Sequence, residues 1–154
     1  MAKKVLLQIE FEMNEIQKLF DVYGTFLETL QKSEPDPVEL AAAASILHSF
    51  YNGVENIFLS IAKRIDLNVP AGDPWHRELL NQMICKNSER ENVISGDTAE
   101  LLSNYLAFRH FFRHSYSHYL NWTELDVLIQ DLSGTWLKVK SELQEFLFQQ
   151  SSKI

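Results

Sequence analysis

Apolar residues recur at steps of three and four along most of this chain, the spacing that places side chains on one face of an α-helix. No strand-like alternation of useful length interrupts this pattern. At 154 residues and 45% hydrophobic content, the chain is long enough to bury a substantial core as a single domain, residues 1–154. We therefore predict an all-α bundle of four long helices and one short helix. The expected segments are Val5–Gln31, Pro37 to about Asp66, about Pro74–Cys85 (the short helix), a helix capped by Asp97 that breaks near Tyr119 or Leu120, and about Trp122–Gln149.

Prolines and short polar side chains indicate where the helices begin and end. The run Glu34-Pro35-Asp36-Pro37 ends the first helix, because each proline removes a backbone donor and restricts the residue before it. Asp36 is expected to be the N-cap of the second helix, with Glu39 completing a capping box. The same reasoning predicts helix starts at Asp73-Pro74, at Asp97 followed by Glu100, and at Asn121 followed by Glu124. The polar run Lys86–Gly96 is predicted to be a surface loop.

The apolar stripe of each helix predicts which residues form the core. In the first helix the stripe is Ile9, Met13, Ile16, Phe20, Tyr23, Leu27 and Leu30, and in the fourth it is Leu101, Tyr105, Phe108, Phe112 and Tyr119. The other helices contribute Phe50, Val54, Ile61, Ile65, Trp75, Leu79, Leu80, Met83, Leu125, Leu128, Leu132, Trp136, Val139 and Leu143.

Charge and cysteine content narrow the class of protein. The formal net charge of −7 disfavours a protein that coats nucleic acid through a broad basic surface. A single cysteine, Cys85, excludes a disulfide within the chain and argues against a disulfide-stapled secreted domain. The apolar run Val5–Leu7 is too short for a signal peptide, and no run approaches the length of a membrane span. We expect a soluble, cytoplasmic protein with no membrane association.

One stretch, Phe108–Tyr119, combines two arginines, three histidines and two tyrosines with apolar residues. Between Leu101 and Trp122 there is no Asp or Glu, although the chain carries 21 acidic residues against 14 Lys plus Arg. A cationic window in an acidic protein predicts a local site for an anion.

A helical wheel separates the reactive side chains of this stretch. At about 100° per residue, the three histidines His110, His114 and His118 lie on the side away from the core stripe, facing solvent or another subunit. Arg109 and His114 are about 140° apart, so an unbroken helix does not aim both at one atom. Either the helix distorts here or two chains contribute to one site.

An arginine and a histidine are sufficient for RNA cleavage without a metal ion. Imidazole can take the proton of a ribose 2′-hydroxyl or supply one to the leaving oxygen, because its pKa lies near neutrality. A guanidinium can bind the phosphate through two hydrogen bonds and stabilise the charge of the transition state. In a two-fold dimer, symmetry-related histidines could supply both the acid and the base.

Arg109, four intervening residues, His114, Ser115 and Tyr116 match an R-x4-H-x-Y motif, and the chain here resembles the HEPN superfamily, specifically the HepT-like ribonuclease toxins. Arg113 and His118 have the same spacing, but only His114 is followed by a tyrosine two places later. The resemblance extends from about residue 45 to 130, through HSFYNGVENIFLSIAKRID, GDPWHRELLNQM and NWTEL.

The resemblance implies an antiparallel HEPN-type bundle and a metal-independent ribonuclease toxin of a prokaryotic toxin–antitoxin system, acting on tRNA or mRNA. It implies a homodimer in which Arg109 and His114 of both chains are catalytic. The implied partner is an MntA-type nucleotidyltransferase antitoxin, which transfers AMP from ATP to the motif tyrosine, here Tyr116. No cofactor and no metal site is expected.

Three further residues are candidates for supporting roles. Many HEPN proteins place Asn or Asp directly after the motif arginine, whereas this chain has His110, whose imidazole also forms hydrogen bonds. Arg113 is either a second phosphate contact or a surface residue that grips RNA. Glu55 either orients an Arg or His of the fourth helix or forms a surface salt bridge. His48 and His76 are read as structural, and Cys85 as a small inert residue.

Alternative functions share the same motif. The chain could be a non-catalytic HEPN module that binds and regulates a nucleotidyltransferase, including as the antitoxin that restrains a toxic enzyme. The i, i+4, i+8 spacing of His110, His114 and His118 also suits a metal site, although the adjacent arginines and the lack of a carboxylate oppose it.

Overall fold

The computed structural model describes residues 2–154 as five α-helices and one short 3-10 turn. The elements in chain order are α1 (Ala2–Leu30), α2 (Pro37–Arg64), α3 (Trp75–Ile84), α4 (Gly96–His114), η1 (Ser117–Tyr119) and α5 (Trp122–Ser151). No strand occurs within this range, and the all-α prediction of four long helices and one short one is confirmed. No helix of residues 2–154 combines the length and the apolar character that a bilayer crossing requires.

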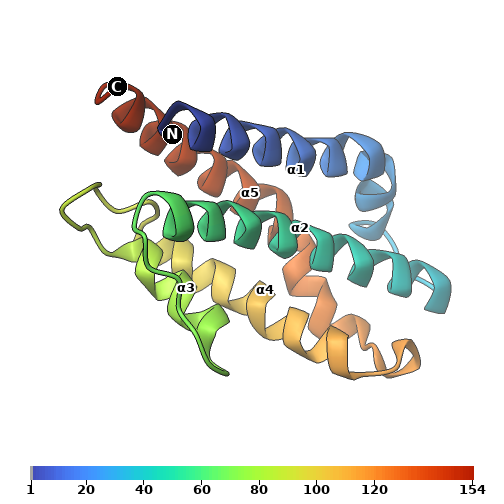
Figure 1. Ribbon diagram of the computed structural model, residues 1–154. Helices are drawn as coiled ribbons and strands as arrows, with labels where there is room; N and C mark the ends of the chain where they lie inside the picture. Colours follow the sequence, from blue (N-terminus) through green and yellow to red (C-terminus); the bar gives the residue numbers. More distant parts are fainter. Residues whose placement is uncertain (1) are drawn as a thin grey trace.

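α2 lies at the centre of the bundle and contacts each of the other α-helices (Figure 1). α1 and α2 run antiparallel, α5 packs against both, and the short α3 lies beside α2 and α4. The two ends of the chain meet at one end of the molecule. The buried face of α2 explains this position, because it carries apolar residues on most of its turns: Ala43, Ala44, Ile46, Leu47, Phe50, Tyr51, Val54, Ile57, Phe58, Ile61 and Ala62.

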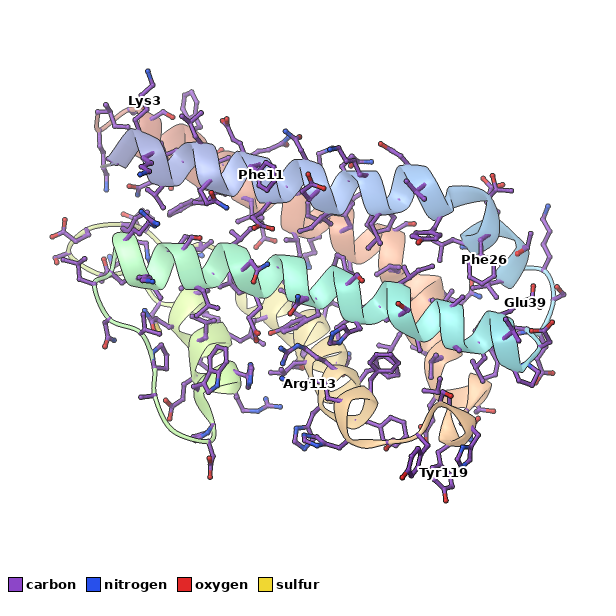
Figure 2. The ribbon with its side chains drawn as sticks, turned by 45° about the vertical axis from the view of Figure 1, so that its right-hand side comes forward. Lys3, Phe11, Phe26, Glu39, Arg113 and Tyr119 are labelled. Atoms are coloured by element: carbon purple, nitrogen blue, oxygen red, sulfur yellow. The ribbon has the colours of Figure 1, made fainter. Side chains whose placement is uncertain are left out.

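The predicted stripes form most of the core, with three exceptions. Tyr23 of α1 is 43% exposed and Tyr119 is 65% exposed, so neither belongs to the core. In α4 the core residue is Leu102, whereas the predicted Leu101 is half-buried and lines a cavity between α4 and α5. Tyr119 was predicted on the assumption that α4 continues to it, but α4 ends at His114 and Tyr119 projects from the turn beyond (Figure 2). The break in the chain therefore comes five residues earlier than predicted.

Two of the four predicted N-cap residues are wrong, although each of these four helices begins within two residues of its predicted start. Asp36 caps α2 and forms a capping box with Glu39, as predicted, and Asn121 caps α5 by accepting from the Thr123 amide. Asp73 makes no cap, because α3 begins after Pro74 without a side-chain acceptor. The N-cap of α4 is Ser95, whose hydroxyl accepts from the Thr98 amide, which leaves Asp97 inside the first turn.

The segment between α3 and α4 is more than the surface loop predicted from its polarity. Val93 and Ile94 are buried, and their amides donate to the carbonyl of Met83 at the end of α3. Arg90 is 2% exposed and binds Asp66 through two hydrogen bonds of 2.7 Å, from Nε and from Nη2. Arg90 also donates to the carbonyls of Cys85 and Glu91, so its buried charge is fully engaged.

The buried pair makes the fold sensitive to acid. Burial favours a raised pKa for Asp66, but hydrogen bonds from Arg90, Gln82 and Asn87 outweigh it and hold the pKa below its ordinary value. A carboxyl with a lowered pKa stabilises the fold fully above its unfolded pKa, and this contribution is lost as pH falls through the folded pKa. We expect Asp66→Ala to reduce the free energy of unfolding at pH 7 by about 3–5 kcal/mol, because Arg90 is left buried and unpaired.

Urea denaturation between pH 7 and pH 3 would measure this effect. The stability of Asp66→Ala should also depend less on pH below about 4 than that of the wild type. Asp21→Ala, at an exposed position on α1, serves as the control and should change stability by at most about 0.5 kcal/mol. Equal stabilities of the Asp66 and Asp21 variants at pH 7 would contradict the prediction.

Candidate functional site

The stretch Phe108–Tyr119 covers the end of α4 and the turn that follows it. α4 ends at His114, because Ser115 has an extended backbone with φ −128° and ψ 153°. The last carbonyl groups of a helix lack partners within the helix and carry partial negative charge, which stabilises nearby cations. Arg113 and His114 occupy this last turn. The helix end therefore suits the basic side chains that the sequence places there.

A cavity of about 630 Å³ lies between the start of α3 and the C-terminal half of α4. Its lining includes a single carboxylate, that of Asp73. The basic and imidazole side chains that line it are His76, Arg77, Arg109, His110, Arg113 and His114. This excess of positive charge in a concave site favours an anionic ligand.

Glu55 of α2 lies buried beside this cavity, with a side chain that is 4% exposed. Its Oε2 accepts a hydrogen bond of 2.8 Å from Nδ1 of His76, and its Oε1 lies 3.5 Å from Nη2 of Arg109. A buried carboxylate is stable only when it is paired, and here one carboxylate pairs with side chains from α3 and α4. Of the two alternatives for Glu55, the surface salt bridge is wrong and the contact with an arginine of α4 is what the structure has.

The contacts around Glu55 also define the tautomer of His76. Arg109 Nη1 lies 3.4 Å from Nδ1 of His76, but Arg109 is only a donor. The shorter contact to Glu55 assigns the hydrogen to Nδ1, so Arg109 and His76 are two donors that face one carboxylate. In the neutral imidazole, Nε2 then carries the free lone pair.

The Arg109 side chain contacts the buried Glu55 and also lines the cavity. The residue is only 8% exposed, and its buried Nε has no hydrogen-bonding partner among residues 2–154. Glu55 engages one edge of the guanidinium, and the side chain also lines the cavity. Glu55 contacts only Nη2, so a bound anion in the cavity could accept from other terminal N–H groups of Arg109.

The positive charge of this region affects the pKa of a neighbouring residue, His48 of α2. Its ring packs against Phe112 with centroids 5.2 Å apart, and its buried Nδ1 has no partner in the described chain. Burial lowers the pKa of His48, and the nearby charges of Arg109 and Arg113 lower it further. The positive charges of these two guanidinium groups therefore disfavour the protonated form of His48.

The structure brings most of the sequence-predicted site residues together. Arg109, His110, Arg113 and His114 line one cavity, and Glu55 contacts Arg109. α4 is a continuous helix through His114, so no distortion brings Arg109 and His114 together. They reach the same space because the cavity extends around the side of the helix.

Tyr116 lies outside this cavity lining. It follows Ser115 in an extended conformation and is 74% exposed. Its ring stacks on that of His118, with centroids 5.5 Å apart and an interplanar angle of 13°. Since consecutive Cα atoms are about 3.8 Å apart, Tyr116 lies within about 7.6 Å of His114 along the backbone. The phenol is therefore accessible from solvent, and Tyr116 follows His114, a residue of the cavity lining, by two positions.

Sequence reasoning missed His76 and Arg77, which line the cavity from α3. His76 was read as structural because nothing local in the sequence places the short helix beside the end of α4. The available signal was the pair of adjacent basic side chains at the start of α3, after an acidic and proline-containing connector.

The alternative of a histidine metal site required His110, His114 and His118 on one helical face. The rings of His110 and His114 do lie together one turn apart, with centroids separated by 4.7 Å and planes inclined by 57°. His118 belongs to η1 instead, beyond the end of α4. In the described part of the chain, no group of three or more His, Cys, Asp or Glu side chains is placed to hold a metal ion.

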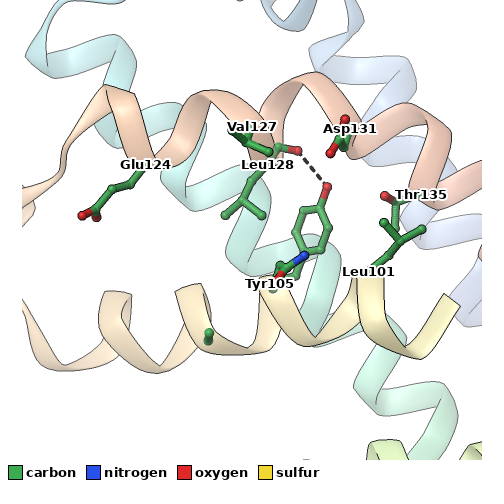
Figure 3. Close-up of a pocket in the computed structure, with 9 residues that line it drawn as sticks. Leu101, Tyr105, Glu124, Val127, Leu128, Asp131 and Thr135 are labelled. Atoms are coloured by element: carbon green, nitrogen blue, oxygen red, sulfur yellow. Dashed lines mark hydrogen bonds between the residues drawn. The ribbon is translucent and has the colours of Figure 1, made fainter. Parts of the chain in front are cut away.

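A second cavity, on the other side of α4, has a different character (Figure 3). It measures about 340 Å³, lies between α4 and α5, and includes the acidic residues Glu124 and Asp131 in its lining. The Tyr105 hydroxyl donates to the carbonyl of Leu128 here, and burial raises the pKa of Tyr105 to about 12. Its lining contains no arginine, lysine or histidine, so it has no feature that would attract a phosphate.

Comparison with known proteins gives one match. A family model described as HepT-like protein matches residues 42–149, which include nearly all of α2 and α5 and the whole of α3 and α4. Searches of curated proteins and of solved structures gave no significant match.

Removing the Glu55 carboxylate should destabilise the protein. We expect Glu55→Ala to lower the free energy of unfolding by about 3–5 kcal/mol, because the buried Arg109 charge loses its counter-ion. Glu55→Gln keeps the shape and one acceptor oxygen, so its loss should be smaller. Urea denaturation at pH 7 measures both, with the exposed Glu100→Ala on α4 as the control. Wild-type stability in Glu55→Ala would show that the buried contacts do not hold α3 and α4.

Proposed function

The chain belongs to the HepT-like family of the HEPN superfamily, and we propose that it is a ribonuclease toxin of a toxin–antitoxin pair, cutting RNA without a metal ion. The observation that carries this proposal is the cavity that Arg109 and His114 line together above the buried Glu55. Its volume, about 630 Å³, lies within the range of pockets that hold small ligands, so it suits one or two nucleotides.

Arg109 is the group that binds the scissile phosphate in this proposal. Its guanidinium can donate two parallel hydrogen bonds to phosphate oxygens, which strengthen as negative charge develops in the transition state. Glu55 contacts the Arg109 guanidinium only through Nη2, and this contact holds the guanidinium in position. A positioned cation in a cavity that is partly shielded from water stabilises that charge more than a mobile surface arginine does.

His114 is the group that transfers a proton. It lies at the exposed end of α4 and lines the same cavity as Arg109, so its ring can meet a bound ribose–phosphate from the solvent side. His110 supports this role by packing at an angle against the His114 ring and so orienting its imidazole. Arg113, in the same last turn of α4, supports it by contacting further phosphates.

The active form in this proposal is a homodimer, with Arg109 and His114 of each chain facing one shared cleft. The exposed His110 and His114 support a composite site, because they point away from the core of their own chain. The substrate is RNA, of the tRNA or mRNA class.

The proposed off-switch is the addition of AMP to Tyr116 by an MntA-type nucleotidyltransferase. The tyrosine oxygen attacks the α-phosphorus of ATP, pyrophosphate leaves, and the phenolic proton passes to solvent or base. The new diester carries about one negative charge. Tyr116 is exposed enough to enter another enzyme, and it follows His114 by two residues, so a nucleotide tethered to it could compete with RNA for the positively charged cavity.

The ribonuclease proposal predicts that the purified chain cleaves RNA in the presence of EDTA. His114→Ala and Arg109→Ala should each reduce the cleavage rate by about 10²–10⁴-fold, because each removes a group that acts on the transition state. Gel analysis of a labelled RNA measures this, with His118→Ala, outside the cavity lining, as the control.

Intact RNA after incubation with the wild type would contradict the nuclease. It would favour instead a non-catalytic HEPN module that binds and regulates a nucleotidyltransferase. Expression of this chain and of the nucleotidyltransferase separately in a bacterial host then identifies which of the two stops growth. The one that does is the toxin.

The modification proposal predicts a mass change. Incubation with the cognate nucleotidyltransferase and ATP should add whole AMP units to the wild type and to Tyr119→Phe, but not to Tyr116→Phe. Tyr119 is the matched control, because it is exposed on the same turn. An unchanged wild-type mass, or equal labelling of both variants, would contradict Tyr116 as the acceptor.

A further inference from the structure

We propose that His76 is the general base of RNA cleavage and that His114, across the same cavity, is the general acid. This inference rests on the proposed ribonuclease function. It adds a catalytic residue from α3 that lies outside the R-x4-H motif and gives one chain a complete pair of proton-transfer groups.

Contacts on two sides hold the His76 ring in place. Its Nδ1 donates to the buried Oε2 of Glu55 at 2.8 Å. The indole of Trp75 packs on the ring, with centroids 3.6 Å apart and planes inclined by 32°. A histidine whose Nδ1–H is held by a carboxylate keeps one tautomer and one orientation, which is the arrangement that a general base requires.

This arrangement leaves the other ring nitrogen available. Hydrogen bonds and close polar contacts among the described residues engage only Nδ1 of His76. The side chain of His76 is 24% exposed and lines the positively charged cavity, whereas the Glu55 side chain that Nδ1 contacts is only 4% exposed. Nε2, with the free lone pair of the neutral ring, is therefore the nitrogen that can receive a proton from a bound ligand.

The other histidines of the region are less suited to this role. His110 lines the cavity, but its ring packs at an angle against His114, the proposed acid, and no carboxylate of the described chain contacts it. His48 lies outside the cavity lining, and the charges of two arginines oppose its protonation. Only His76 combines access to the cavity with an orienting carboxylate.

In this proposal, His76 and His114 act from opposite sides of the reacting phosphorus. In cleavage by transesterification, the attacking 2′-oxygen and the leaving 5′-oxygen lie on opposite sides of phosphorus. His76 belongs to the α3 wall of the cavity and His114 to the α4 wall, and Arg109, beside Glu55, can bind a non-bridging oxygen between them.

The proton transfers balance without a co-reactant. The 2′-oxygen bonds to phosphorus while its proton passes to Nε2 of His76. The bond from phosphorus to the 5′-oxygen breaks, and this oxygen takes a proton from the His114 imidazolium. The products are a 2′,3′-cyclic phosphate and a 5′-hydroxyl, and one proton has moved from the acid to the base through the substrate.

A sulfur-substituted substrate tests the two roles separately. Two single-stranded RNA oligonucleotides are compared, one with ordinary linkages and one with a sulfur in place of the 5′-bridging oxygen at the cleaved bond. A thiolate leaves without protonation, so the modified substrate removes the need for an acid but keeps the need for a base. His76→Asn is the informative variant, because the amide of asparagine can still donate to Glu55 but cannot accept the proton.

We expect His76→Asn to lose about 10²–10⁴-fold in rate on both substrates. His114→Ala should lose a similar factor on the ordinary RNA and recover most of it on the sulfur substrate. Wild-type rates in His76→Asn would overturn the proposal, since a residue that only positions Arg109 is replaced adequately by asparagine. Recovery of His76→Asn on the sulfur substrate would also overturn it, because it would make His76 the acid.

Two controls keep the result interpretable. His118→Asn, outside the cavity lining, should cleave both substrates as the wild type does. If His76→Asn does not fold, as judged by its circular dichroism and thermal midpoint, His76→Gln replaces it and the same outcomes apply. If the wild type cuts neither substrate, the proposed ribonuclease function is wrong. If the wild type and His76→Asn both cut the ordinary RNA and His114→Ala does not, only the proposed role of His76 is wrong.

Discussion

The buried carboxylate of Glu55 constrains the arrangement of three helices. A carboxylate removed from water is stable only with hydrogen-bonding and charged partners, and those of Glu55 come from His76 on α3 and Arg109 on α4. The pairing requires α3, the shortest α-helix, to lie with its first turn against the middle of α2. The cavity between α3 and α4 is a consequence of this position, and so is the orientation of the two side chains at its wall.

Charge is distributed unevenly over the bundle. The protein as a whole carries a formal charge of −7, while the basic and imidazole side chains of α3 and α4 converge on one cavity with a single carboxylate in its lining. The acidic groups elsewhere reduce non-specific attraction to nucleic acid, because long-range attraction follows the field of the whole molecule. An anionic ligand of this cavity would therefore be held by short-range contacts inside it, and not by the field of the whole molecule.

Much of the fold could be predicted from sequence, because helical periodicity and caps are local properties. The five helices and the capping box at Asp36 follow from spacing and residue type alone. The error at Asp97 arose because a second polar residue, Ser95, lies two positions earlier and makes the cap. The error at Asp73 arose because α3 begins one residue later than predicted, with Pro74 in the N-cap position and no side-chain cap. The end of α4 was placed too late because aromatic residues continue past His114 without a proline or glycine to mark the break.

The site could be predicted only in part. The residues of α4 were found because they share one motif, and Glu55 was found as one of two alternatives. His76 could not be recognised in this way, because its contact with Glu55 joins residues 21 positions apart and depends on how α3 folds back.

The pair of Asp66 and Arg90 has a consequence for how α3 is fastened to the bundle. Asp66 follows the end of α2 and Arg90 follows the end of α3, so their pairing joins the two ends of the segment that carries α3. The contacts that α1, α2 and α5 make with one another do not involve this segment. One wall of the cavity is thus fastened to α2 and to the chain just after it at two separate points, by Glu55 near the start of α3 and by Asp66 beyond its end.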